Sequence, residues 1–224
     1  AEIAIQGFFI VSGALVAGSL VRSQSLADYA GKRVRRLYPA YAAVILIPAL
    51  ISLLMGGTAG GVAEYVGANL VFLNFLSPDL PGLFEGNRFT EVNGALWTLK
   101  IEVMFYLCLP IIGWILRRMG RAQWIVLVAL YAAGEAWRHY VPVLLDHPLA
   151  PVLARQLPGQ MAFFASGIAL WRLWDLAKAR PLLFGAVGLG LVLLSFTHPA
   201  LVPARAAGLT GLIAAIAFMP GPVL

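Results

Sequence analysis

The fold of this chain is decided by residues 93–110, which read Asn93-Gly94-Ala95-Leu96-Trp97-Thr98-Leu99-Lys100-Ile101-Glu102-Val103-Met104-Phe105-Tyr106-Leu107-Cys108-Leu109-Pro110. The apolar run continues to Leu116. It gives about 21 residues, which would extend roughly 31 Å as a helix, close to the hydrocarbon thickness of a bilayer. The stretch therefore predicts a helix that spans a membrane.

Two charged residues, Lys100 and Glu102, lie inside this predicted span. Together they cost about 5 to 7 kcal/mol in hydrocarbon, whereas the eleven Leu, Ile, Phe and Val residues of 96–116 return only about 3 to 7 kcal/mol. Helical spacing puts Glu102 and Tyr106 on one face and Lys100 on another, close enough to the helix start to snorkel outward. Glu102 is therefore predicted to need a protein partner or a water-filled cavity, as a functional or a structural carboxylate.

Composition extends this prediction to the whole chain. Of the 224 residues, 61% are hydrophobic and 12% charged, and the mean hydropathy is +0.86, outside the range of soluble domains. The apolar runs are long and lack a period of two, which favours helices over a transmembrane barrel. We therefore expect an all-α fold, a polytopic transmembrane helical bundle of about seven spans in a single domain over residues 1–224. The predicted spans are 3–21, 39–55, 96–116, 123–137, 158–174, 181–197 and 207–219.

Charge sets the expected orientation of these spans. The net charge of +6 and the pI near 9.8 come from basic residues clustered between apolar runs, so they indicate membrane topology and not a nucleic-acid partner. The loop predicted over residues 22–38 carries five Lys and Arg residues against one acid and is expected inside. The acidic segment 56–95 is expected outside. Within it, residues 67–76 are apolar but too short to span, which predicts an interfacial or re-entrant piece.

Arg33 and Arg36 lie in the basic segment. Ser25 and Asp28 predict a helix start that would place both arginines on one face, where guanidinium groups can hold phosphates. The alternative is an ordinary positive-inside cluster. On the first span, Gly13 and Ala17 form a small-xxx-small pair that lets another helix approach closely, and Ser12 beside them is either functional or part of this packing face.

Several kinds of chemistry have no signal in the sequence. His139, His147 and His198 are expected in loops without ligands at metal spacing, so no metal site is predicted. There is no phosphate-binding loop, no hydrolase nucleophile elbow and no dinucleotide fingerprint, and no resident cofactor is expected. Cys108 is the single cysteine, so no disulfide can form within the chain.

Three stretches, in this order, resemble the polytopic membrane acyltransferase-3 family. They are Phe8-Phe9-Ile10-Val11-Ser12-Gly13, then Arg33-Val34-Arg35-Arg36-Leu37-Tyr38-Pro39, and then Asn93-x-x-x-Trp97-Thr98-Leu99-x-x-Glu102-x-x-Phe105-Tyr106. A weaker fourth stretch is Leu157-Pro158 followed by Phe163-Phe164-Ala165-Ser166-Gly167. The resemblance covers roughly residues 4 to 170, and the order and separation of the stretches make it fairly specific.

The resemblance implies a multi-pass enzyme of the bacterial inner membrane, similar to O-acetyltransferases. Such an enzyme would take an acetyl or similar acyl group from cytoplasmic acyl-CoA, as a co-substrate, and deliver it to a hydroxyl of a cell-surface saccharide or glycolipid. The implied roles follow the motifs: Arg33 and Arg36 hold donor phosphates, Ser12, Trp97 and Tyr106 line or pack the acyl path, Asn93 orients the acceptor, and Glu102 polarises a histidine or the acceptor.

The chain also departs from the family pattern. The family's first helix, with its Arg and catalytic His, is expected upstream of Ala1, and its closing helices beyond Leu224. None of the three histidines matches the catalytic position, so this stretch is expected to be inactive by itself. The main alternative is a transporter or flippase component in which Glu102 is a proton or substrate site, and a second is a noncatalytic scaffold.

Overall fold

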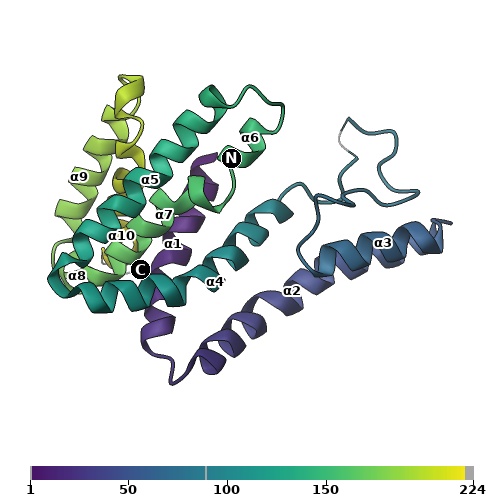
Figure 1. Ribbon diagram of the computed structural model, residues 1–224, viewed down its shortest axis with the longest axis horizontal. Helices are drawn as coiled ribbons and strands as arrows, with labels where there is room; N and C mark the ends of the chain where they lie inside the picture. The colour runs from purple at the N-terminus through teal and green to yellow at the C-terminus, as the bar shows by residue number, and fades with distance from the viewer. Residues whose placement is uncertain (1, 89, 220–224) are drawn as a thin grey trace, which may run out of the picture. The chain divides into compact units, whose positions relative to one another are not determined.

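The computed structural model describes residues 2–88 and 90–219 (Figure 1). Ala1 and Leu224, beyond which further helices of the family are expected, lie outside the described residues. The helices are α1 (Glu2–Val21), α2 (Leu26–Leu54), α3 (Ala59–Leu70), α4 (Leu96–Met119), η1 (Gly120–Ala122), α5 (Gln123–Leu144), α6 (Ala150–Ala154), α7 (Leu157–Arg172), α8 (Trp174–Ala179), α9 (Pro181–Leu194), η2 (Pro199–Leu201) and α10 (Ala204–Phe218). The all-α prediction is confirmed, since extended pairing in the described part of the chain is limited to one isolated bridge, Asp79 with Glu91.

A helix lies at each of the seven predicted spans: α1, α2, α4, α5, α7, α9 and α10. The predicted span 158–174 runs past the end of α7 at Arg172 to the start of α8, and the predicted span 181–197 runs past the end of α9 at Leu194. By length and composition, three described stretches are long and apolar enough to cross a membrane: Glu2–Val21, Leu26–Leu54 and Leu96–Leu144, the last covering α4, η1 and α5. Helices α9 and α10 are apolar but shorter. The chain is therefore a helical membrane protein.

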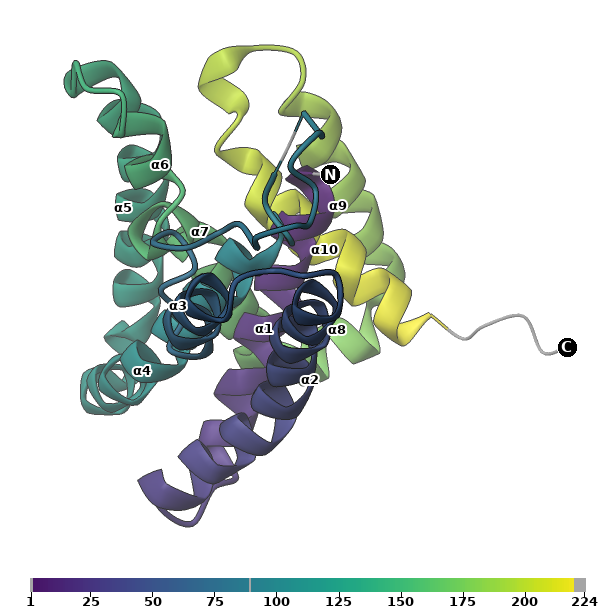
Figure 2. The same ribbon diagram turned by 90° about the vertical axis from the view of Figure 1, so that its right-hand side faces the viewer.

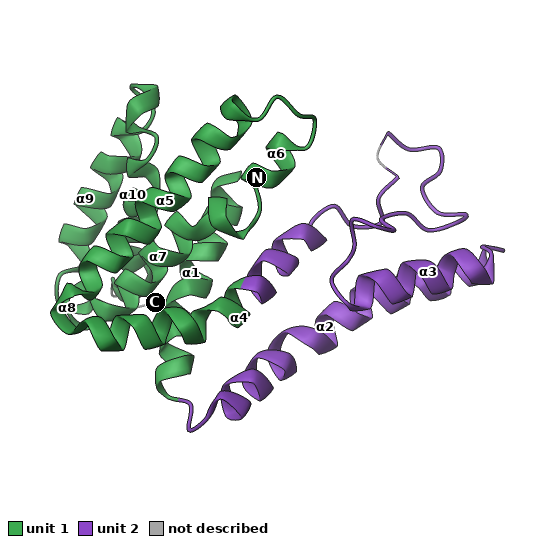
Figure 3. Ribbon diagram, in the orientation of Figure 1, with its two compact units in different colours: residues 1–22, 105–224 green, residues 23–104 purple. Residues whose placement is uncertain are grey.

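The chain divides into two compact units, coloured separately in Figure 3. Unit 1 comprises residues 1–22 and 105–224, and unit 2 comprises residues 23–104. The division falls within α4, whose first turns belong to unit 2 and whose remainder belongs to unit 1. Each unit is described by itself.

Unit 1 is held together by close helix packing through glycines. A Cβ on Gly13 of α1 would lie 2.6 Å from the carbonyl oxygen of Phe164 on α7, and a Cβ on Gly167 would lie 2.1 Å from the carbonyl oxygen of Ile10. The Phe164 ring, fully buried, stacks on Phe105 with centroids 4.0 Å apart. The close approach predicted for Gly13 is thus made against α7, and the first and fourth family-like stretches pack on each other.

Helices α9 and α10 form a second glycine-mediated pair in unit 1, and they lie side by side in Figures 1 and 2. A Cβ on Gly188 of α9 would lie 2.7 Å from the carbonyl oxygen of Gly208 on α10. A Cβ on Gly211 would lie 2.5 Å from the carbonyl oxygen of Phe184. Only glycine permits this backbone separation, so the two short apolar helices behave as one hairpin.

Unit 2 is built from α2, α3 and the segment 71–95, which is pinned to both helices. The Tyr41 hydroxyl donates to the Asn69 carbonyl (2.7 Å), and the Asn69 amide donates to the carbonyls of Tyr65 and Ser77 (2.8 Å each). The Ser52 hydroxyl donates to the Pro81 carbonyl (2.6 Å). These bonds fix the backbone that leads into α4, and Leu96 joins the same apolar cluster.

The predicted loop over 22–38 is wrong for residues 26–38, because α2 is continuous from Leu26 to Leu54 with Pro39 inside it. The predicted helix start is confirmed: the Ser25 hydroxyl accepts from the Asp28 N–H (3.1 Å), and Lys32 pairs with Asp28 (2.7 Å). A proline inside a helix removes one backbone hydrogen bond, whereas a helix that ended in an apolar setting would leave several backbone groups without partners. The smaller loss favours a continuous α2 through Pro39. At 29 residues α2 is about 44 Å long, more than hydrocarbon alone requires.

Residues 67–76 do not form a span. Helix α3 ends at Leu70, and the chain then turns, with Phe72 in the left-handed region at φ 64°. Residues 67–76 are therefore divided between the end of α3 and a turn, and they do not form one continuous helix.

Helix α5 continues past the predicted span end at Trp137 to Leu144, so residues 138–144, expected between the spans 123–137 and 158–174, are helical. Arg138, the first residue beyond the predicted span, pairs with Glu135 within the helix, so its charge does not mark the helix end. His139 consequently lies on a helix and not in a loop. Residues 150–154 of the predicted loop form the short helix α6.

Candidate functional site

Glu102 lies on the buried face of α4. Its side chain is 4% exposed, and the residues at helical spacing from it, Tyr106 and Leu109, are buried as well. Leu107 and Ile111 mark the opposite face, with 72% and 63% of their surface exposed. A carboxylate in a membrane helix is expected to face protein or water and not lipid. In α4 the exposed face carries apolar residues, and Glu102 lies on the buried face.

Asn93 and Trp97 occupy the entrance to this helix. The Asn93 side-chain oxygen accepts from the Ala95 N–H (2.9 Å), and the Thr98 hydroxyl donates to the Ala95 carbonyl (2.8 Å). Both Asn93 and Trp97 are half-buried. The side-chain oxygen of Asn93 therefore shapes the turn into α4, which leaves its amide nitrogen as the group that can meet a ligand.

Lys100 reaches away from the Glu102 face. Its ammonium group lies 5.1 Å from the centre of the Phe75 ring, in the segment that follows α3. The long side chain thus lies over an aromatic residue of the segment between α3 and α4.

Arg33 and Arg36 lie one turn apart on the first half of α2. Arg33 is half-buried, with its guanidinium 6.0 Å from the centre of the Tyr29 ring, whereas Arg36 is exposed. Asp28 is already paired with Lys32, so the acid nearest in sequence is engaged by another cation. The two arginines therefore present a basic side of a helix that begins outside the apolar run.

Ser12 and Tyr106 belong to unit 1. Ser12 is buried on α1 beside Gly13, at the contact with α7, and Tyr106 is buried on α4. The site residues predicted from the motifs therefore fall into two groups: Asn93, Trp97, Glu102, Arg33 and Arg36 in unit 2, and Ser12 and Tyr106 in unit 1.

A second buried carboxylate, Glu135 on α5, was not predicted. It is 5% exposed, and both of its carboxylate oxygens accept from Nη2 of Arg138 (2.8 and 2.7 Å). The Nδ1 atom of His139 lies 3.5 Å from the same carboxylate. The cost argument that singled out Glu102 applies equally to an acid twelve residues into an apolar helix, and it would have found Glu135.

Across residues 2–88 and 90–219, no group of three or more His, Cys, Asp or Glu side chains is placed to hold a metal ion.

Comparison with known proteins places these elements in a family. The sequence profile of a family described as "Acyltransferase domain", the acyltransferase-3 family, matches residues 1–222. The chain belongs to the acyltransferase-3 family. The resemblance carried by the four stretches is thereby confirmed, and the match includes the helices that hold Ser12, Arg33, Arg36 and Glu102.

Two curated relatives of this acyltransferase-3 chain are similar over most of its length. Nodulation protein 10 of Rhizobium leguminosarum bv. viciae is 30% identical over 241 residues, covering 97% of this chain and 65% of the relative. An O-acetyl transferase of Shigella phage Sf6 is 26% identical over 188 residues, covering 80% of this chain and 54% of the relative. The chain thus spans about two thirds and about half of their lengths. No solved structure is significantly similar to it.

Proposed function

We propose that the protein is an integral membrane acyltransferase that moves an acetyl or similar acyl group from cytoplasmic acyl-CoA to a hydroxyl of a cell-surface saccharide or glycolipid. Membership of the acyltransferase-3 family and the name of the phage relative support acyl transfer. The bacterial and phage sources of the relatives support a bacterial inner membrane. Neither relative is named as a transporter, so the transporter alternative has no support from the comparisons.

The observation that carries the proposal is the burial of Glu102, within the family-like stretch, on the protein-facing side of a membrane helix. In this proposal the carboxylate polarises a histidine supplied by the rest of the protein, or the acceptor hydroxyl directly. The Asn93 amide orients the acceptor at the outer end of α4. Arg33 and Arg36 bind the phosphates of acyl-CoA from the cytoplasmic side, where guanidinium groups offer paired donors. Ser12, Trp97 and Tyr106 line or pack the acyl path.

The test is Glu102→Gln in the full-length protein, assayed in membranes for transfer of a radiolabelled acetyl group to the host's surface polysaccharide. Loss of a proton-transfer or polarising group lowers the rate by about 100-fold or more, while the amount of inserted protein stays unchanged. Glu64→Gln is the matched control, because Glu64 is exposed on α3 and should leave the rate unaltered. Transfer by the Glu102 variant at the parental rate would remove this residue from the site.

A further inference from the structure

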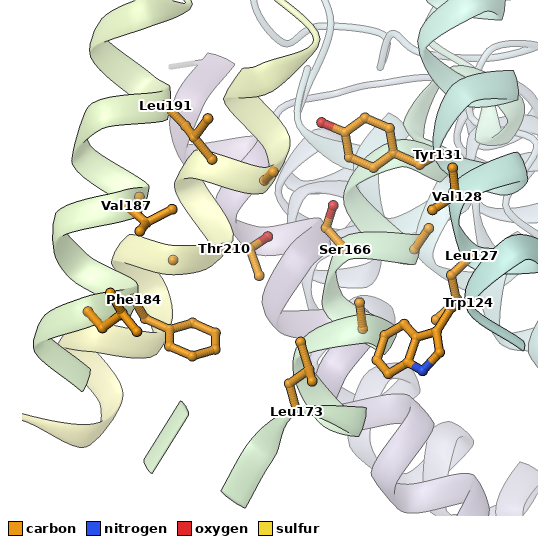
Figure 4. A pocket seen from close by; sticks show the side chains of 16 residues that line it. Trp124, Leu127, Val128, Tyr131, Ser166, Leu173, Phe184, Val187, Leu191 and Thr210 are labelled. Carbon is orange, nitrogen blue, oxygen red and sulfur yellow. The ribbon is translucent and has the colours of Figure 1, made fainter. Parts of the chain in front are cut away.

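Helices α5, α7, α9 and α10 of unit 1 surround a hollow of about 520 Å³ (Figure 4). Its lining runs from Trp124 to Tyr131 on α5 and from Leu183 to Leu191 on α9, so about 12 Å of helix borders it. In Figure 4 the lining residues near the start of each helix, Trp124 and Phe184, lie at one end of the hollow. Tyr131 and Leu191 lie at the other end, so α5 and α9 run in the same direction along it. The lining is largely aliphatic and aromatic, and we call the hollow the apolar groove.

The hydroxyl groups in the wall of the apolar groove already donate to backbone carbonyls. The donors, labelled in Figure 4, and their acceptors are Tyr131 to Pro203, Ser166 to Ala162 (2.8 Å) and Thr210 to Ala206 (2.8 Å). These hydroxyl protons are unavailable to a ligand. A polar guest would lose its hydration here without replacement, so the apolar groove fits a hydrocarbon chain.

The apolar groove opens sideways to the surface of unit 1. Val128 and Val187 both line it, yet 67% and 53% of their surface is exposed. Exposed aliphatic side chains on the helices of a membrane protein lie against lipid chains, which are as apolar as they are. A hydrocarbon chain of the bilayer can therefore enter the groove from the side.

Two arginines precede the lining at the end of the apolar groove where α5 and α9 begin. Arg121 lies three residues before Trp124, and Arg180 lies three residues before Leu183. Both arginines are exposed. Because α5 and α9 run in the same direction, both arginines belong to the same end of the groove, and we call them the basic rim.

The positive charge of the basic rim is not balanced within the chain. The sequence has no acid over residues 103–134 and only Asp175 over residues 147–224. Among the residues that the structure describes, neither Arg121 nor Arg180 takes part in an ion pair. Basic pockets between membrane helices on the cytoplasmic side bind anionic lipid headgroups, so the rim is suited to a phosphate.

The length of the apolar groove matches one leaflet of a bilayer. The hydrocarbon of a single leaflet is about 15 Å deep, half of the usual core, and the groove extends about 12 Å from the basic rim. A lipid chain whose headgroup lies at the rim would thus reach Tyr131, where the lining on α5 ends. A further membrane-spanning helix would need a groove along the whole hydrocarbon core, about 30 Å.

We infer that the apolar groove binds an acyl chain of an anionic phospholipid, such as phosphatidylglycerol, whose phosphate lies at the basic rim. Since basic residues favour the cytoplasmic side, the lipid belongs to the cytoplasmic leaflet. The inference does not depend on acyl transfer, because this phospholipid is neither donor nor acceptor in the proposed function and the site lies in unit 1 alone.

The experiment uses the full-length protein in nanodiscs that contain a fixed fraction of phosphatidylglycerol with a photoactivatable diazirine in one acyl chain. With phosphatidylcholine as the bulk lipid, we expect labelled peptides from α5, α9 and α10. Replacing the bulk lipid by phosphatidylglycerol with the same chains should lower this labelling about fivefold or more, because the anionic lipid competes for the basic rim. Equal labelling in the two bulk lipids would overturn the inference, since the groove would then accept any lipid chain.

Matched variants test the basic rim. With phosphatidylcholine as the bulk lipid, Arg121→Gln with Arg180→Gln should reduce labelling about fivefold or more, because each basic side chain near the surface strengthens binding of an anionic lipid about fivefold. Arg117→Gln with Arg118→Gln makes the same charge change in the last turn of α4, outside the lining, and should leave labelling near that of the parent. Equal labelling by the two double variants would overturn the role of the rim.

A second pair of variants tests the apolar groove. Val187→Trp should fill it and reduce labelling, while Leu182→Trp, on the same helix but outside the lining, should not. A benzoylphenylalanine in place of Val187 then reports the occupant directly. Cross-links to phosphatidylglycerol would support the inference, and cross-links to another segment of the full chain or to a second copy would overturn it.

Discussion

Glu102 and Glu135 are both buried in membrane helices of this protein, and they differ in the charged residues that neighbour them on their own helix. Glu135 has Arg138 one turn away, with both carboxylate oxygens bonded to one guanidinium nitrogen. Around Glu102 the positions three and four residues away are Thr98, Leu99, Phe105 and Tyr106, none of them basic. Glu135 is therefore paired with a cation of its own helix, whereas the same positions around Glu102 offer hydroxyl groups and no cation.

The Glu135–Arg138 pair gives a stability prediction. Arg138→Ala should lower the free energy of unfolding by about 3 kcal/mol, because it leaves a buried carboxylate without its partner. Thermal unfolding of the purified full-length protein measures this change. Arg155→Ala, an exposed arginine, is the control, and the double variant Glu135→Gln with Arg138→Ala should recover part of the loss. A single variant as stable as the parent would show that this pair contributes little.

Arg33 and Arg36 give a kinetic prediction. Replacing both by Ala should raise the KM for acyl-CoA roughly 10-fold or more, because each charge-assisted hydrogen bond to phosphate contributes about 1.5 to 3 kcal/mol. Acetyl transfer at varied donor concentration measures it. Arg117→Ala with Arg118→Ala provides a control of equal charge change in the last turn of α4. The same KM in the Arg33 and Arg36 variant would return these residues to a role in topology.

At the scale of elements, the contact between α1 and α7 gives the clearest prediction. Gly167→Ala should destabilise the protein by about 1 to 3 kcal/mol, because the added Cβ would meet the backbone of Ile10 and Ala14 at 2.1 and 2.8 Å. Gly190→Ala on α9 has open space around it and should be neutral or stabilising, since alanine favours a helix. Thermal unfolding of the two variants compares them directly. Equal stability would mean that α1 and α7 are not held at this separation.

Helices could be predicted from the sequence wherever hydropathy was the deciding quantity. A helix lies at each of the seven predicted spans, three described stretches are long and apolar enough to cross a membrane, and the errors lie at the ends of the predicted segments. Pro39 was placed in a first turn but lies inside α2, and Arg138 was taken as the end of a span but pairs within α5. In both cases the cost of exposing backbone groups in an apolar setting outweighs the local signal. The histidine on α5 was misplaced for the same reason.

At the scale of the whole molecule, the sequence offers candidate residues for a site but not the contacts between distant segments. Glu102 follows from the cost of a charge in hydrocarbon, and Arg33 with Arg36 follows from helical spacing. Contacts between distant segments leave no such local signal. The packing of Gly13 on Gly167 joins residues more than 150 positions apart, and residues of α5, α7, α9 and α10 line one hollow. They depend on tertiary packing that periodicity does not encode.

Orientation in the membrane gives the prediction for the whole molecule. A basic start to α2, an acidic segment 71–95 and a short α3 place Gln24 inside and Glu85 outside, with α2 as the single crossing between them. Helices α4 and α5 then return the chain to the outside at Asp146, and α7 brings Lys178 inside. Single cysteines at these four exposed positions, in a Cys108→Ala background, report the side of the membrane.

A membrane-impermeant maleimide should label Glu85→Cys and Asp146→Cys in intact spheroplasts, and Gln24→Cys and Lys178→Cys only after permeabilisation. The pair Glu85 and Asp146 tests the structure most sharply, because α4 and α5 separate them by two crossings and they must agree. If residues 59–76 crossed the membrane, Glu85 would share the side of Gln24, and Glu102 would lie in the inner half of the bilayer. That result would separate Glu102 from a surface saccharide and end the case for its contact with the acceptor.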